Sequence, residues 1–194
     1  MEIKETEKFV VNLLTSKLPA SLYYHNLEHT MDVVQAAENL AALEGITQQA
    51  DKFLLRTAAL LHDCGFAVNY SEHETEGCIL ARIHLPGWGY SNGDIDSICG
   101  MIMATRMPQQ PDGILEKILC DADLDYLGRD DFDSISRKLF REWQARGKNY
   151  SENEWNKVQT DFLASHRYWT SSADRLRGKP KQEHLKKIRA KLKK

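Results

Sequence analysis

Apolar residues recur every three to four positions along most of the chain, and this spacing restricts the fold more than any other feature. Such a period places apolar side chains on one face of an α-helix, whereas a half-buried strand needs alternation with a period of two. Alternating runs and hairpin turns are missing where a sheet would need them. The sequence therefore predicts an all-α fold, a compact helical bundle.

Helix caps and breakers divide the chain into expected helices. Thr47 is expected to cap the third helix and the segment Ser71-Glu72-His73-Glu74 to open the fourth as a capping box, with residues 170–179 as a linker. The expected ranges are 3–18, 26–45, 47–63, 71–84, 92–105, 112–128, 130–143 and 151–169.

The chain's 194 residues suit one main domain. We expect residues 1–169 to form that helical domain, followed by a basic linker and C-terminal amphipathic helix over residues 170–194. Residues 167–194 carry 11 of the 26 Lys and Arg residues and only two of the 28 acidic ones. We favour docking of this basic tail on the acidic body over contact with nucleic acid or an anionic surface.

Composition and the N-terminal sequence indicate a cytoplasmic protein. The first residues are charged and resemble no secretory signal, and no apolar run is long enough to be a transmembrane segment. The four cysteines form no Cys-x-x-Cys pair, which favours reduced thiols.

Three clusters of ionisable residues lie on or beside expected helices. His25 and His29 form the first, with His29 inside the second helix, His62-Asp63 stands at the end of a buried apolar helix, and Asp121-Ala122-Asp123 lies on the sixth helix. Burying such groups is costly unless something binds them, and helices that pack around one centre can bring them together. Imidazoles with carboxylates suit a divalent ion, with Mn, Fe, Co or Zn preferred to Mg.

The order His, His-Asp, Asp on a helical scaffold resembles the HD-domain metal-dependent phosphohydrolases over residues 23–127. The resemblance implies that His29, His62, Asp63 and a distal aspartate hold the metal. Tyr24-His25-Asn26-Leu27-Glu28-His29 is also similar to the Tyr-His-Asn-x-x-His motif of class I cyclic-nucleotide phosphodiesterases, which implies that His25 is a general acid. The i, i+4 spacing would place His25 and His29 on one helical face.

The distal ligand has two candidates, because Asp-Ala-Asp-Leu-Asp is one residue shorter than the family's usual segment. Alignment from upstream selects Asp123, which we prefer, and a gap selects Asp121. A second, looser metal at His73 and Glu74 is an alternative to one metal, although Thr105 stands where two-metal relatives often supply a histidine.

Together these features predict a metal-dependent phosphohydrolase that cleaves a phosphoester or phosphoanhydride bond of a small substrate, with a nucleotide favoured. His25 and Asp63 would be catalytic, with Asp63 also a metal ligand. Arg106 and Arg129 follow site-bearing helices and could bind phosphate. Two alternatives stay open: a di-iron oxygenase of the same superfamily, and a non-catalytic binding module stabilised by metal.

Overall fold

The computed structural model describes residues 1–192, and the fold over this range is all-helical, with no strand. Short 3₁₀ turns follow several helices at the points where the chain changes direction. The α-helices are α1 (Ile3–Lys17), α2 (Leu27–Leu43), α3 (Gln49–Leu61), α4 (His73–His84), α5 (Asn92–Ala104), α6 (Ile114–Asp123), α7 (Phe132–Ala145), α8 (Glu152–Ser165), α9 (Ser171–Ala173) and α10 (Lys179–Leu192). The short turns are η1 (Cys64–Ala67), η2 (Leu85–Trp88), η3 (Asp125–Gly128) and the π-helical η4 (Asp174–Gly178).

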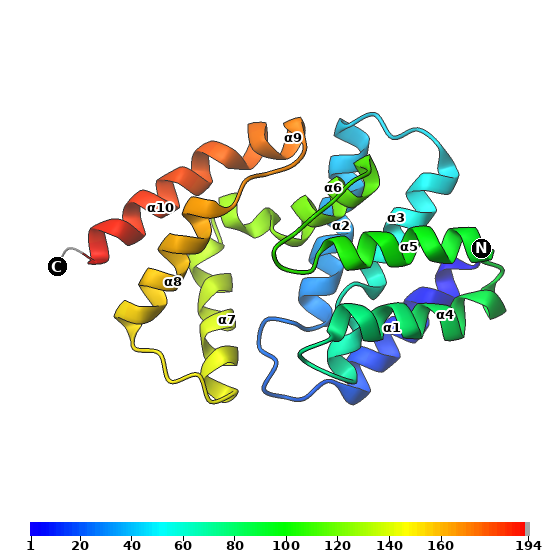
Figure 1. The fold of residues 1–194 in the computed structure, drawn as a ribbon, viewed down its shortest axis with the longest axis horizontal. Helices are drawn as coiled ribbons and strands as arrows, with labels where there is room; N and C mark the ends of the chain where they lie inside the picture. Colours follow the sequence, from blue (N-terminus) through cyan, green and yellow to red (C-terminus); the bar gives the residue numbers. More distant parts are fainter. Residues whose placement is uncertain (193–194) are drawn as a thin grey trace.

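Helices α1 to α6 pack around the larger hydrophobic core (Figure 1). Helix α3 is the central element, because every residue from Thr57 to Leu61 is buried and it contacts α1, α2 and α5. His62 and Asp63 directly follow this buried segment, so packing of the core fixes the position of both residues.

A second, smaller cluster joins α7, α8 and α10 on the other side of the molecule (Figure 1). Leu185 and Ile188 of α10 are buried in it, and α10 packs along α8 and against η3. The described part of the basic tail, up to residue 192, is thus docked on the body. Asp125 accepts hydrogen bonds from Arg177 at 2.7 and 3.0 Å, which ties η4 to η3.

Three local predictions were wrong. The residue before α3 is Gln48 rather than Thr47, and no side chain caps the start of α3 or α4, so residues 71–74 form no capping box. Residues 171–178 are helical instead of an open linker, because Thr170 caps α9 through the backbone N–H of Ala173 and η4 continues it into α10. By contrast, the capping box of Ser151 and Glu154 at α8 is confirmed.

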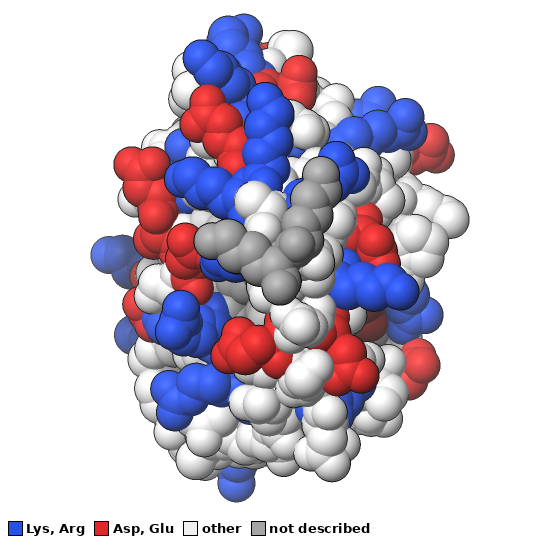
Figure 2. Space-filling model, turned by 90° about the vertical axis from the view of Figure 1, so that its left-hand side faces the viewer, with Lys and Arg blue, Asp and Glu red and all other residues white. Residues whose placement is uncertain are grey.

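The face that carries the end of α10 has many Lys and Arg side chains, but Asp and Glu side chains lie among them (Figure 2). Among the described residues, acidic side chains therefore interrupt the basic ones on this face. Within residues 1–192, no helix is both long enough and apolar enough to cross a membrane. The four cysteines are unpaired.

Candidate active site

Two histidines and two aspartates from three segments converge between the two cores. His29 lies in the first turn of α2, His62 and Asp63 follow α3, and Asp123 is the last residue of α6. The His29 Nε2 atom is 3.2 Å from Asp123 Oδ1 and 3.5 Å from Asp63 Oδ2. The His62 Nε2 atom is 3.3 Å from Asp63 Oδ2 and 3.6 Å from Asp123 Oδ1. The structure therefore brings the predicted ligands together.

The polar atoms of this cluster fit a shared cation. His62 Nε2 and Asp63 Oδ2 are buried and have no hydrogen-bond partner within residues 1–192, which is costly without a ligand. The Nδ1–H of His62 donates to the Ala59 carbonyl at 2.8 Å, so the Nε2 lone pair is free to bind. Ligand atoms about 2.0–2.2 Å from one ion are at most about 4.4 Å apart, and the separations above satisfy this limit.

The electrostatics of the cluster show that it needs positive charge. Burial alone would raise the pKa of Asp63 and Asp123, but the neighbouring histidines outweigh burial and hold both values well below the ordinary range. Burial likewise lowers the pKa of His62, yet the two aspartates outweigh it and raise the value. A divalent ion would supply the same stabilisation to both carboxylates without protonating the imidazoles.

The backbone before α2 places His25 beside this cluster. The Asn26 side chain caps α2 by accepting from His29 N–H at 3.2 Å, and its amide donates to the Tyr23 carbonyl at 3.0 Å. His25 therefore precedes the helix, and the expectation that His25 and His29 share a helical face was wrong. Their ring centroids are nevertheless 6.1 Å apart, because the capped turn folds His25 back over the site.

Glu142 of α7 holds His25 in place from 117 residues away. Its fully buried carboxylate accepts hydrogen bonds from His25 Nδ1–H, from the backbone N–H groups of Tyr24 and His25 at 2.9 and 3.1 Å, and from the Tyr70 hydroxyl at 3.3 Å. Burial lowers the pKa of His25, but the hydrogen bond to Glu142 and the charge of Asp63 more than offset it. The pKa of His25 is consequently raised, which favours the protonated imidazole.

Asp121 does not join the cluster. It is completely buried, and its carboxylate accepts hydrogen bonds from Trp169 N–H at 2.8 Å and from the N–H and hydroxyl of Thr170, both at 2.7 Å. Burial raises its pKa to about 6, although these hydrogen bonds oppose the shift. Asp121 therefore anchors the start of α9, and Asp123, not Asp121, faces His29 and His62.

His73 and Glu74 lie next to the cluster, at the start of α4. His73 Nε2 is 3.7 Å from Asp63 Oδ1 and 3.5 Å from Glu74 Oε1, and Glu74 is buried. Thr105 is also near, but its hydroxyl donates to the Ile102 carbonyl at 2.8 Å. The two residues named for a looser second ion thus adjoin the first group.

The two arginines predicted to bind phosphate both form ion pairs with carboxylates of the chain. Arg106 donates to Glu72 at 3.1 Å and to Thr75 at 2.8 Å on the surface of α4. Arg129 donates to Asp32 at 2.7 Å and also pairs with Asp131. Neither guanidinium group lines the cavity described below, but Arg106 Nε also lies 3.4 Å from Glu74 Oε2, and Arg129 lines a neighbouring pocket together with His29. Their assignment to phosphate therefore stays a prediction.

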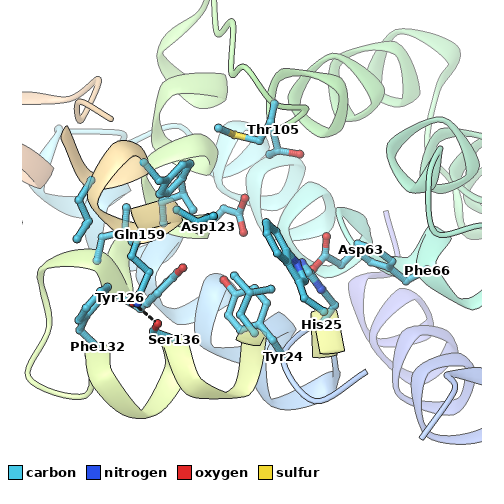
Figure 3. Close-up of a pocket in the computed structure, with 18 of the residues that line it drawn as sticks. Tyr24, His25, Asp63, Phe66, Thr105, Asp123, Tyr126, Phe132, Ser136 and Gln159 are labelled. Carbon is cyan, nitrogen blue, oxygen red and sulfur yellow. Dashed lines mark hydrogen bonds between the residues drawn. The ribbon is translucent and has the colours of Figure 1, made fainter. Parts of the chain in front are cut away.

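A cavity of about 300 Å³ opens from the cluster toward α7 and α8 (Figure 3). His25, Asp63 and Asp123 line one end, and Phe132, Ser136 and Gln159 line the other. Its walls are mainly aromatic and aliphatic side chains, and no Lys or Arg of the described chain lines it. The cluster therefore faces a largely apolar chamber.

Sequence reasoning missed Glu142 and the cavity residues of α7 and α8. One signal was available for Glu142, which follows Leu139 and Phe140 and precedes Trp143 on the apolar side of its helix. A glutamate there is rarely buried without a partner. The partner itself, His25, could not be read from the sequence.

Comparisons with known proteins agree with this geometry. The HD domain model matches residues 26–125. No curated protein matches the chain. Two solved structures are similar in fold. One is Bacillus subtilis YpgQ in complex with ADP, at 18% identity over 98% of this chain and 96% of that chain, with a TM-score of 0.67. The other is a predicted HD superfamily hydrolase from an uncultured Thermotogales bacterium, at 21% identity over 97% and 90%, with a TM-score of 0.61.

The matched segment covers more than half of the chain and contains His29, His62, Asp63 and Asp123. His25 and Glu142 lie outside it. On the family match, together with the fold, this chain belongs to the HD domain family.

Proposed function

We propose that the protein is a divalent-metal-dependent phosphohydrolase that cleaves a phosphoester or phosphoanhydride bond of a small substrate, with a nucleotide favoured. One observation carries the proposal: His29 and His62 each lie within 3.6 Å of both Asp63 and Asp123, and ligand atoms of His29, His62 and Asp123 lie within 4.8 Å of one another. Two buried atoms of this cluster also have no hydrogen-bond partner within residues 1–192. Mixed nitrogen and oxygen ligands suit Mn, Fe, Co or Zn, and Mg less well.

A divalent ion held there supplies a water of lowered pKa and polarises a phosphoryl oxygen. The residues of the chain provide the remaining chemistry. Asp63 would help to hold the ion and would accept the proton that the attacking water loses. His25, kept protonated by Glu142, donates a proton to the leaving oxygen as that oxygen gains charge. The hydrogen bond from His25 Nδ1–H to Glu142 leaves Nε2 as the donating atom.

The preference for a nucleotide has two supports. YpgQ, which shares the fold, is described in complex with ADP. The cavity beside the cluster also joins a metal-binding end, suited to phosphate, to an aromatic chamber. An oxygenase would require two irons, and Thr105 rather than a histidine stands beside the cluster. Measured metal content decides between these chemistries.

The test is a screen of nucleoside mono-, di- and triphosphates and cyclic nucleotides with added Mn²⁺ or Co²⁺. Activity should appear in the wild type and fall by at least about 100-fold in His62→Ala and Asp63→Asn, with bound metal lost and helical circular dichroism kept. Asp96→Asn is the matched control, since Asp96 is exposed and pairs only with Arg82. Full activity in His62→Ala, or two tightly bound irons per chain, would overturn the proposal.

A further inference from the structure

The inner half of the cavity has a composition that the metal site does not explain. Figure 3 shows Asp63 and His25 on one side of the cavity, and Tyr126, Phe132, Ser136 and Gln159 on the other. At about 300 Å³ the cavity is at the lower end of the range for small-molecule sites, about 300–1,000 Å³. Space for a substrate group therefore continues well beyond the reacting centre.

Charge decides what this inner half can hold. The lining includes no Lys or Arg among the described residues, and its carboxylates lie at the metal end. A phosphate placed between α7 and α8 would lose its hydration without gaining a countercharge, which is strongly unfavourable. The phosphate must therefore stay at the metal end, and an uncharged group must occupy the inner half.

The shape of that group follows from the aromatic walls. Phe132 and Tyr126 lie parallel with their centroids 6.2 Å apart, and Trp155 stacks against Phe140 at 5.2 Å, so these rings are held rigidly by packing. Rigid aromatic walls favour planar aromatic groups through offset or edge contacts. A flexible alkyl chain would gain area here but no such geometric preference.

One polar pair interrupts the apolar inner wall. The Ser136 hydroxyl donates to Gln159 Oε1, and both residues line the cavity. The Gln159 amide nitrogen has only a 3.5 Å contact with Asn156 Oδ1, and Ser136 is buried. The carbonyl oxygen keeps a second lone pair and the amide keeps donors, so the pair can both accept from and donate to the edge of a heterocycle.

We propose that the space between α7 and α8 binds the planar heterocyclic group of the substrate, and that Gln159 and Ser136 determine its specificity. This inference rests on the proposed function for the position of the phosphate at the cluster. For a nucleotide, the base enters the chamber and the phosphates stay beside His29, His62, Asp63 and Asp123. A site built to hydrogen-bond a substrate discriminates strongly against analogues without the matching group.

The experiment compares probes that share a phosphoanhydride but differ in the group attached to it. The Mn²⁺-loaded protein is given adenosine and guanosine 5′-diphosphates, ribose 5-diphosphate and inorganic pyrophosphate, and kcat/KM is measured for each. Octyl phosphate serves as the alkyl competitor. Binding of adenosine and guanosine without phosphate is followed separately by the fluorescence of Trp143 and Trp155, which line the cavity.

The variants are Gln159→Leu, which keeps the side-chain volume but removes its hydrogen bonds, and Leu139→Trp, which fills the chamber. Gln144→Leu is the matched control, because Gln144 is exposed on α7 and outside the cavity. We expect a preference of at least about 10-fold for the base-bearing diphosphates over ribose 5-diphosphate. Gln159→Leu should reduce that preference by about 10-fold, whereas Gln144→Leu should leave it unchanged.

The outcomes separate the two proposals. Hydrolysis that is indifferent to the base, or stronger inhibition by octyl phosphate than by nucleosides, would overturn the inference and leave the hydrolase assignment standing. Saturable nucleoside binding that is lost in Gln159→Leu and Leu139→Trp, without hydrolysis of any probe, would support the chamber and overturn the hydrolase assignment. Neither binding nor hydrolysis would overturn both. A variant that unfolds is recognised by circular dichroism, and the other variant then decides.

Discussion

Glu142→Gln is the sharpest test of how the structure prepares His25 for proton donation. The glutamine matches the volume of Glu142 and keeps one oxygen, which can still accept from the backbone N–H groups of Tyr24 and His25. Its amide would then face His25 Nδ1 as a donor, so the ring could no longer donate there. Burial would still lower the pKa of His25, but the hydrogen bond to the Glu142 carboxylate that raises it would be lost.

The expected catalytic effect follows from that loss. A positioned general acid contributes about 10²–10⁴-fold to rate, so kcat at neutral pH should fall by roughly 100-fold or more. Activity that requires protonated His25 declines as the pH rises through its pKa. The alkaline limb of the kcat/KM profile should therefore move to lower pH in Glu142→Gln, while metal content stays at the wild-type level.

Stability should change with a defined pH dependence. The pKa of Glu142 is lowered despite its burial, so its contribution is present above its unfolded value of 4.5 and is lost as the pH falls through the folded value. The pKa of His25 is raised, so its contribution is present below 6.5 and is lost as the pH rises through the folded value. The pair therefore stabilises the folded state most between pH 4.5 and pH 6.5.

Removing one partner of a buried pair costs about 3–5 kcal/mol, and the retained hydrogen bonds should limit the loss to about 1–3 kcal/mol. Urea unfolding at pH 5.5 and pH 9 measures this loss of unfolding free energy. The free energies of Glu142→Gln and the wild type should differ less at pH 9 than at pH 5.5. Glu38→Gln, which removes a surface pair with Arg56, is the control. Wild-type kcat and an unshifted pH profile in Glu142→Gln would refute the role of this carboxylate.

Three further predictions concern the framework of the site. Asp121→Ala should lower the free energy of unfolding in a urea titration by about 1–3 kcal/mol, because the N–H groups of Trp169 and Thr170 lose their acceptor. Bound metal should be retained, and its loss would restore Asp121 as a candidate ligand. Gly65→Ala should reduce both metal content and thermal stability, because the new Cβ would lie 1.9 Å from the backbone oxygen of His73. Gly113→Ala, where a Cβ meets open space, is the control and should be tolerated. Full metal content in Gly65→Ala would contradict the close packing of Gly65 against His73. Leu185→Ala should cost about 2–5 kcal/mol by calorimetry, since the buried side chain ties α10 to the second core, and a loss below 1 kcal/mol would show that the tail docks only weakly.

Local chemistry in the sequence was sufficient for much of this protein. Helix positions followed from apolar period and breakers, so α1, α2 and α5 lie within two residues of their expected limits, whereas α6 ends at Asp123, five residues before the Gly128 expected to end it. His29 and His62-Asp63 were identifiable because ionisable groups at the ends of apolar helices need a ligand. Each of these features depends on residues only a few positions apart.

Tertiary structure decided which of two nearby aspartates faces the cluster. Asp121 and Asp123 are two residues apart near the end of one helix, so they point to different sides of it. The side that meets His29 and the side that meets Thr170 are set by the packing of α6 against α2 and by the path of the chain into α9. No pattern within residues 119–125 contains that information.

The sequence by itself determined an all-helical HD chain and most of its candidate metal ligands, because helical period and local motif are properties of short segments. Only the tertiary structure revealed that the Glu142 carboxylate binds His25, that a chamber lies between α7 and α8, and that Arg106 and Arg129 form ion pairs. Glu142 meets His25 across 117 residues, and a contact at that separation depends on how the two cores pack together.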